Sequence, residues 1–162
     1  MEETVLIEVS VNGHSRRDHV PARLLLADYI REWCGMLGTH VACAQGVCGS
    51  CTILVNDLPI RSCLVLAAQV NGDAIRTVES LATDGALSTL QTSFRANHAL
   101  QCGFCTSGIL MTAQALLERT DELETEQIEE AISGHVCRCT GYEPILAAVR
   151  DAAQAWNRDP AL

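Results

Sequence analysis

The sequence predicts an α+β protein in which a small mixed domain is followed by a helical bundle. Apolar residues alternate along the first segment, as in a β-strand, whereas from residue 87 onward they recur with helical spacing. Between the two patterns, residues 79–86 are rich in Ser, Thr, Asp and Gly, which favours a linker. We therefore expect one domain over residues 1–78 and a second over residues 87–162.

The first domain is expected to open with a hairpin. Residues 4–11 place alternate apolar side chains on one face, and Asn12-Gly13 follows as a turn signal. A helix is predicted over residues 24–33, ending near Gly35. The remaining elements are a loop of small residues at 38–49 and strands at 52–55 and 74–78. This order of two strands, a helix and two strands indicates a mixed α+β domain.

The second domain is predicted to contain four helices. Apolar residues spaced for one helix face occur in four segments, at 87–94, 109–117, 128–132 and 145–156. Four helices of this length most simply form a compact bundle.

Composition and charge exclude several classes of partner. The chain has 162 residues, 48% of them apolar, and a formal net charge of −9, which is the wrong sign for binding nucleic acid. The longest apolar run, Cys63 to Ala68, is too short to cross a membrane. The acidic start, Met1-Glu2-Glu3, does not fit an export signal. We expect a soluble cytoplasmic protein that binds neither nucleic acid nor membrane.

Nine cysteines are the outstanding feature of the composition. In a reducing compartment thiols do not pair as disulfides, so metal binding is the expected use of most of them. The odd number leaves one cysteine outside any arrangement in pairs or fours.

Four cysteines of the first domain are spaced as C-x4-C-x2-C with a fourth after eleven residues. They are Cys43, Cys48, Cys51 and Cys63. This is the plant-type ferredoxin spacing for a 2Fe-2S cluster. Ala and Gly within the loop let the backbone turn tightly with its N–H groups facing sulfur. Zinc is the alternative, but it rarely uses so long a loop of small residues.

A second set of four cysteines lies in the helical domain. Its members are Cys102, Cys105, Cys137 and Cys139, spaced as C-x2-C and C-x-C with 31 residues between the pairs. Each pair precedes a predicted helix, so two helix N-termini would direct N–H groups and positive dipole ends at an anionic cluster. On spacing alone, zinc stays open as an alternative here.

The remaining candidates carry no recognisable chemistry. Cys34 is interpreted as a buried bystander. His40 and His135 lie near the cysteine loops, where we expect them to support the site or face solvent rather than to ligate metal. No nucleotide-binding or nucleophile motif is present, so no catalytic site is expected on this chain.

Taken together, the motifs resemble one family. They are Cys43-x4-Cys48-x2-Cys51-x11-Cys63, Cys102-Gly103-Phe104-Cys105 and Cys137-Arg138-Cys139-Thr140-Gly141-Tyr142. The chain resembles, over nearly its whole length, the small iron–sulfur subunit of the molybdenum hydroxylases, the xanthine oxidase superfamily. The resemblance implies a β-grasp plant-type ferredoxin domain and a four-helix bundle, each holding one 2Fe-2S cluster. Ser107 stands where the family commonly has Pro, but no cysteine of the pattern is missing.

The resemblance also implies partners and an electron path. A large subunit would oxidise substrate at a molybdopterin centre, a medium subunit would carry FAD, and the family's manner of assembly implies a dimer of heterotrimers. The cluster of the helical domain would lie nearer molybdenum. Gln101 matches a glutamine that contacts the pterin, and Cys139 matches the ligand that couples its cluster to the pterin. A stand-alone ferredoxin-like carrier and a zinc-stapled interaction module are the competing functions.

Overall fold

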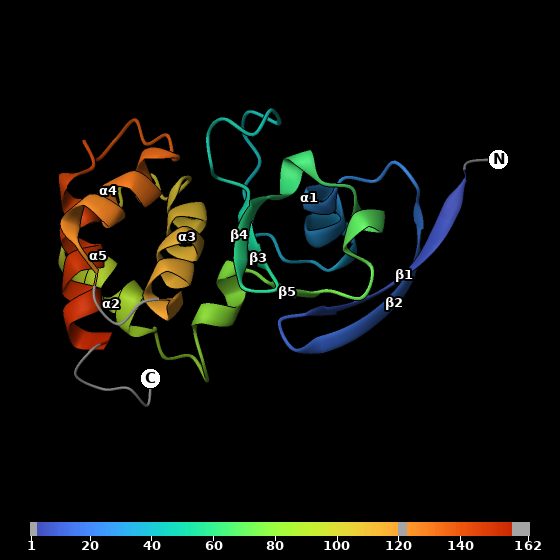
Figure 1. Cartoon of the computed structure of the whole chain (residues 1–162), viewed down its shortest axis with the longest axis horizontal. Helices are drawn as coiled ribbons and strands as arrows, with labels where there is room; N and C mark the ends of the chain where they lie inside the picture. Colours follow the sequence, from blue (N-terminus) through green and yellow to red (C-terminus); the bar gives the residue numbers. More distant parts are fainter. Residues whose placement is uncertain (1–2, 120–122, 157–162) are drawn as a thin grey trace.

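A mixed five-stranded sheet forms the first half of the molecule, and four helices form the second half (Figure 1). The computed structural model describes residues 3–119 and 123–156. The sheet followed by four helices confirms the predicted α+β class and the succession of a β-grasp domain and a four-helix bundle.

The sheet has the strand order β2-β1-β5-β3-β4. Its strands are β1 (Thr4–Val11), β2 (His14–Pro21), β3 (Thr52–Val55), β4 (Leu58–Arg61) and β5 (Ala74–Arg76). Strands β1 and β2 form the predicted hairpin, with Val11 opposite His14, and β1 pairs in parallel with β5. The alternation in β1 buries Ile7, Val9 and Val11 on one face, as the sequence predicts.

Strand β4 is not among the predicted strands, which end at residue 55 and resume at residue 74. It pairs antiparallel with β3, with Pro59 opposite Leu54. A proline argues against a strand in a sequence pattern, but an edge strand tolerates it because one side of its backbone needs no partner. Strand β4 lies at the edge of the sheet.

The helix predicted over residues 24–33 is shorter and less regular than expected. It consists of α1 (Leu26–Asp28), which continues into the wide π-helical turn η1 (Tyr29–Trp33). The N–H of Cys34 donates to the carbonyl of Tyr29 at 3.0 Å, and Gly35 then leaves the helix with φ of +71°. Leu26, Tyr29 and Ile30 pack on the sheet and complete the core of this domain.

Three short 3-10 segments follow β4, two of them between β4 and β5 and one after β5, before the bundle. They are η2 (Ser62–Leu64), η3 (Ala67–Val70) and η4 (Val78–Leu81). Segment η4 overlaps the start of the expected linker, and a bridge between Thr83 and Ala86 closes a turn within it.

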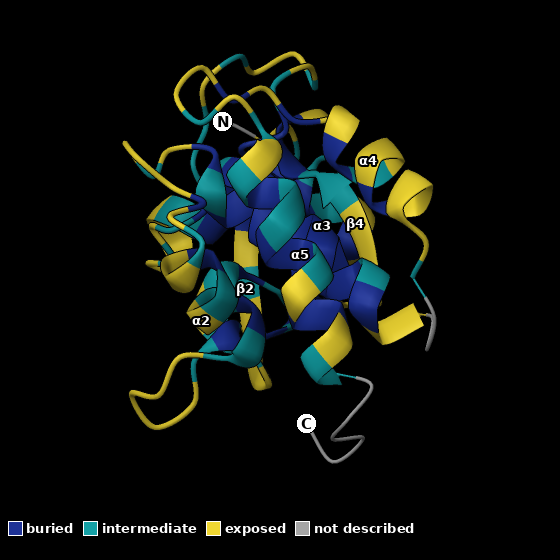
Figure 2. Cartoon of the chain, turned by 90° about the vertical axis from the view of Figure 1, so that its left-hand side faces the viewer, coloured by how far each residue is buried: buried dark blue, intermediate teal, exposed yellow. Residues whose placement is uncertain are grey.

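The four predicted helices are present. They are α2 (Thr89–Ala96), α3 (Thr106–Arg119), α4 (Thr125–Ser133) and α5 (Glu143–Trp156). Ser88 caps α2 by accepting from the N–H of Gln91 at 3.2 Å, so Leu87, expected on the helix face, lies outside it and is exposed. Figure 2 shows the buried faces of α3 and α5 at the centre of the bundle and exposed residues along α4.

Helix α3 also covers the sheet. All four residues of β3 are buried, because Ile53 and Val55 pack in the first core whereas Leu54 packs with the bundle. Arg76 of β5 donates to the carboxylate of Glu118 on α3 at 2.9 Å, which adds a charged link across the same junction. The bundle is therefore held directly against the ferredoxin-like sheet.

Candidate metal centres

The cysteine loops of the two domains lie on the same side of the molecule. Figure 1 shows the loop before β3 and the loop between α4 and α5 at the top of the view. The eight cysteines predicted as ligands fall into two groups, one in each domain. The first quartet is Cys43, Cys48, Cys51 and Cys63, and the second quartet is Cys102, Cys105, Cys137 and Cys139.

The loop of the first quartet directs backbone N–H groups at a sulfur. The N–H groups of Cys48 and Gln45 each donate to Sγ of Cys43 at 3.4 Å. These bonds, the one from Cys48 first, lower the pKa of Cys43 to about 6. The turn requires left-handed backbone at Ala44, Gly46 and Gly49. The prediction that small residues let N–H groups face sulfur is confirmed for Cys43.

The other two cysteines of the first quartet are buried beneath the loop. Burial, followed by contact with the thiol of Cys51, raises the pKa of Cys63 to about 11. Ser62 fixes their relative position, since its N–H and Oγ both donate to the carbonyl of Cys51, at 3.3 and 2.7 Å. The first quartet thus consists of the neighbouring pairs Cys43/Cys48 and Cys51/Cys63.

The second quartet also divides into two pairs. Sγ of Cys139 lies 3.6 Å from Sγ of Cys102, and both residues are exposed. Cys105 and Cys137 are buried, and their thiols are also in contact. Burial, and then the neighbouring thiol of Cys137, raise the pKa of Cys105 to about 12.

Hydrogen bonds oppose burial at Cys137. Burial alone would raise the pKa of this thiol, but contacts from Thr140 and Cys139 outweigh it and lower the pKa. Thr140 Oγ1 lies 3.1 Å from the sulfur. The N–H groups that contact this sulfur come from the loop at Cys139 and Thr140, whereas the sequence predicted donors at the N-terminus of α5.

The two quartets are joined by a backbone hydrogen bond. The N–H of Val136, next to Cys137, donates to the carbonyl of Cys48 at 2.9 Å. The approach is close because Gly49 and Gly108 lack side chains. A Cβ on Gly49 would lie 2.4 Å from Nδ1 of His135, and a Cβ on Gly108 would lie 2.2 Å from the carbonyl oxygen of Gly49.

These contact residues were not singled out from the sequence. Gly108 carries one signal that the sequence could have offered, because it lies in the first turn of α3. A glycine inside a helix is unfavourable unless close packing requires it. Val136 carries no signal, since its contribution is a backbone N–H.

His135 is buried where the domains meet. Nε2 lies 2.8 Å from Thr112 Oγ1, whereas Nδ1 has no hydrogen-bond partner among the described residues. Burial, together with the charge of Arg61, lowers the pKa of His135 to about 4. Arg61 in turn donates to the carbonyl of Gly134 at 2.7 Å. His135 is therefore neutral near pH 7 and packs against the first cysteine loop.

Gln101 and Cys139, predicted to face the pterin, lie together at the surface. Nε2 of Gln101 donates to the carbonyl of Cys139 at 2.9 Å, and both residues are exposed. Their placement on one exposed edge of the second quartet agrees with a role toward a partner.

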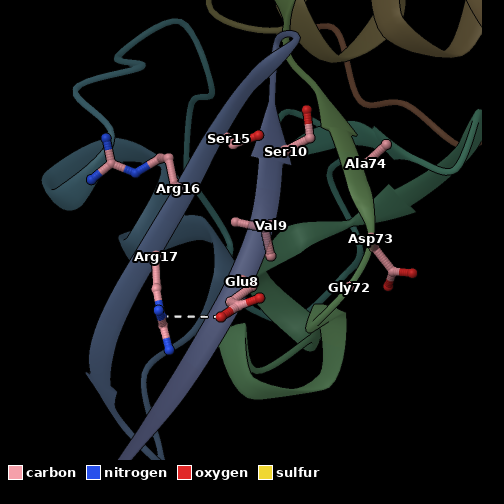
Figure 3. Close-up of a pocket in the computed structure, with 9 residues that line it drawn as sticks. All are labelled: Glu8, Val9, Ser10, Ser15, Arg16, Arg17, Gly72, Asp73 and Ala74. Atoms are coloured by element: carbon pink, nitrogen blue, oxygen red, sulfur yellow. Dashed lines mark ion pairs between the residues drawn. The ribbon is translucent and has the colours of Figure 1, made fainter.

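Other features of the chain lie apart from the quartets. Cys34 is half-buried behind η1, and burial raises the pKa of its thiol. A hollow on the outer sheet is lined by β1, β2 and the turn before β5, and an ion pair between Arg17 and Glu8 at 3.0 Å crosses it (Figure 3). No cysteine lines this hollow.

The thiol arrangement fits a 2Fe-2S cluster in each domain. Such a cluster has two irons and four cysteine ligands, so each iron requires two adjacent thiols. The thiols approach one another two by two in both quartets.

Comparison with known families identifies the class of protein. A family described as 2Fe-2S iron-sulfur cluster binding domain matches residues 9–82, and one described as [2Fe-2S] binding domain matches residues 77–150. The chain is an iron–sulfur protein with two 2Fe-2S domains, and the zinc alternatives are thereby excluded.

Similar proteins identify the particular family. The chain is 53% identical over 150 residues to the nicotine 6-hydroxylase small subunit of Paenarthrobacter nicotinovorans, covering 93% of this chain and 90% of that protein. It is 40% identical over 151 residues to the xanthine dehydrogenase iron-sulfur-binding subunit of Escherichia coli O157:H7, covering 92% and 94%. A chain of quinoline 2-oxidoreductase from Pseudomonas putida 86 superimposes with a TM-score of 0.91 at 47% identity, covering 96% and 97%.

The chain belongs to the iron–sulfur small subunits of the xanthine oxidase family of molybdenum hydroxylases. It is the iron–sulfur component of an oxidoreductase complex, and its relatives are named as subunits. The resemblance drawn from the cysteine motifs is confirmed. None of the helices in residues 3–119 and 123–156 is long and apolar enough to span a bilayer.

Proposed function

We propose that this chain carries electrons from a molybdopterin centre in a large subunit, through two 2Fe-2S clusters, to FAD in a medium subunit. The observation that carries the proposal is the 2.9 Å hydrogen bond from Val136 N–H to the carbonyl of Cys48. It joins a residue next to one proposed ligand directly to another proposed ligand, so the two clusters would be linked through a short covalent and hydrogen-bonded path.

The proposed ligands are the two quartets. In the first cluster, Cys43 and Cys48 would bind one iron, and Cys51 and Cys63 the other. In the second cluster, the pairs would be Cys102 with Cys139 and Cys105 with Cys137. The thiol contacts within each pair support this assignment. When bound, each cluster supplies a centre that accepts and donates single electrons, and this chain supplies no catalytic residue.

The exposed pair of the second quartet is proposed to face the large subunit. Cys102 and Cys139 are exposed, and Gln101 lies beside them with its amide on the carbonyl of Cys139. Leu100 and Phe104, close in sequence to Gln101 and Cys102, are 42% and 43% exposed, and apolar side chains exposed together are typical of a surface that a partner covers.

The first quartet is proposed to face the flavin subunit. Val47 and Leu64 are 65% and 61% exposed beside its loop. A Cβ on Gly46 would lie 2.4 Å from Leu64, so Leu64 packs against the residue next to Val47. The two exposed apolar surfaces accompany different quartets, as a relay between two partners requires.

We further propose a dimer of heterotrimers in the cytoplasm, with a ferredoxin-like domain over residues 1–78, a linker over 79–86 and a bundle over 87–162. Separate hydrophobic cores in the sheet and the bundle support this division. The large subunit would determine the substrate.

The test is removal of one cluster from the purified complex. Cys48→Ser should abolish the EPR signal of the first cluster and halve the iron content from four atoms per chain, leaving reduction of molybdenum by substrate at the wild-type rate. Turnover with the flavin-linked acceptor should collapse. Cys34→Ser is the matched control and should keep four irons and full turnover.

Two results would contradict the proposal. One is a complex that retains acceptor turnover without the first cluster. The other is a fully loaded chain that stays a stable monomer without partners and shuttles electrons freely, which would establish the ferredoxin-like carrier instead.

A further inference from the structure

One side chain of the first cysteine loop contacts the loop of the second quartet. Nδ1 of His40 lies 2.9 Å from the carbonyl oxygen of Phe104, and the two rings stack with centroids 4.8 Å apart and planes 21° apart. Ser107 Oγ lies 3.4 Å from the same nitrogen. Because a carbonyl only accepts, Nδ1 must carry the hydrogen and donate it to Phe104.

The carbonyl that His40 contacts belongs to a peptide unit of the second site. The same unit contains the N–H of Cys105, the residue whose sulfur is the proposed ligand. A hydrogen bond accepted by a carbonyl polarises its peptide and strengthens the donor at the other end. His40 therefore makes the peptide group next to the proposed ligand Cys105 more positive at its N–H end.

We propose that His40 is a positioning residue that holds the peptide between Phe104 and Cys105 and raises the reduction potential of the second cluster. The proposal rests on the function proposed above, in which Cys105 is a ligand. N–H donors to the sulfurs stabilise the more negative, reduced state of an iron–sulfur cluster, and they are one of the factors that set its potential.

Sequence position alone would suggest a different role. His40 lies three residues before Cys43 and so belongs by sequence to the first cluster. In the structure, its hydrogen bond, its stacking partner and its neighbouring hydroxyl all belong to residues 104–107. A substitution at His40 should accordingly change the second cluster more than the first.

The experiment is redox titration of the purified complex monitored by EPR, comparing the wild type with His40→Phe and His40→Asn. Phenylalanine keeps an aromatic ring for stacking but removes the donor. The Asn side-chain amide places an N–H at the position of Nδ1. His14→Phe, at an exposed position in the hairpin, is the matched control.

In His40→Phe we expect the ratio of reduced to oxidised second cluster at a fixed potential to fall about 1.3- to 4.5-fold, because hydrogen bonds in a chain strengthen one another by roughly 10–30% and a bond to a charged group is worth about 1.5–3 kcal/mol. For a one-electron couple this is a shift of about 7–39 mV to more negative potential. The first cluster should move less. His40→Asn should restore most of the shift, and His14→Phe should cause none.

Loss of the second cluster alone in His40→Phe, with retention in His40→Asn, would also support the role. The inference is overturned if neither variant moves the second cluster, if the first cluster moves as much, or if the Asn variant shifts as far as the Phe variant. A wild-type complex without two EPR signals would instead refute the proposed function itself.

Discussion

Gly108→Ala places two well-known effects in opposition. Alanine is the better helix former, so the exchange in α3 should by itself stabilise the protein by about 1 kcal/mol. The new methyl group, however, would lie 2.2 Å from the carbonyl oxygen of Gly49 and 3.1 Å from Cα of Ser50. Both contacts are with backbone of the first cysteine loop, which has no flexible side chain to move aside.

The steric effect should exceed the gain in helix propensity. Overpacking a core position typically costs about 1–3 kcal/mol. The carbonyl of Gly49 also accepts from the N–H and Oγ1 of Thr52, at 3.1 and 2.6 Å, and each bond is worth about 0.5–1.5 kcal/mol. Displacing that oxygen weakens both bonds. We expect a net loss of about 1–4 kcal/mol and a Tm lower by at least about 2 °C.

The assay is thermal unfolding of the cluster-loaded chain, followed by circular dichroism and by visible absorbance. Ala147→Gly, the reverse exchange at a half-buried position of α5, measures the effect of helix propensity alone and should lower the free energy of unfolding by about 1 kcal/mol. An unchanged or higher Tm for Gly108→Ala would refute the reasoning, because it would show that the loop moves away from α3 without loss.

Three further predictions concern the junction and the second quartet. Burial alone would raise the pKa of Glu118, but hydrogen bonds from Arg76 and Gln114 lower it. The ion pair with Arg76 therefore stabilises the folded protein fully at pH values above 4.5, the ordinary pKa of this carboxyl group, and the stabilisation is lost as the pH falls through the lowered pKa. Glu118→Gln should lower the free energy of unfolding by about 1 kcal/mol at pH 7, and the difference in urea midpoint from wild type should shrink below pH 4.5. Tyr142→Phe removes a hydroxyl that accepts from Cys137 N–H at 2.9 Å and donates to the carbonyl of His135 at 3.0 Å, so a chelator should extract iron faster from the second cluster and equally fast from the first. Arg61→Lys removes the guanidinium group that donates to both Thr52 Oγ1 and the carbonyl of Gly134, so the Val136 amide should exchange hydrogen about tenfold faster. Unchanged exchange would show that the guanidinium group does not hold this segment.

Local patterns were sufficient to predict most of the elements. Alternation in residues 4–11 and the Asn12-Gly13 turn are properties of neighbouring residues, and so is the helical spacing of the bundle. Strand β4 was missed because Pro59 opposes a strand locally and is tolerated only at a sheet edge, which depends on the finished topology. The π-helical turn at residues 29–33 was missed for a similar reason, since Tyr29 is held by its hydroxyl donating to Asp18 on β2 at 2.7 Å.

The two cysteine quartets could be predicted, but the contact between them could not. Spacing along the chain groups the cysteines because a 2Fe-2S site limits loop length. The hydrogen bond from Val136 to Cys48 joins residues 88 positions apart through backbone atoms alone. Every residue except proline has a backbone N–H, so the sequence does not mark this donor. His40 and Phe104 are likewise 64 positions apart.

The absence of side chains explains why the two quartets lie so close. Gly49 is approached by the imidazole of His135 and by Gly108, and a Cβ on Gly49 or on Gly108 would clash at these two approaches. The imidazole is neutral near pH 7 because burial, together with Arg61, lowers its pKa to about 4, so no ionised side chain is inserted at this point. What remains between the loops is a hydrogen bond and closely packed backbone. A relay between two fixed centres requires a short, constant separation, and close packing of backbone against backbone supplies it more rigidly than flexible side chains would.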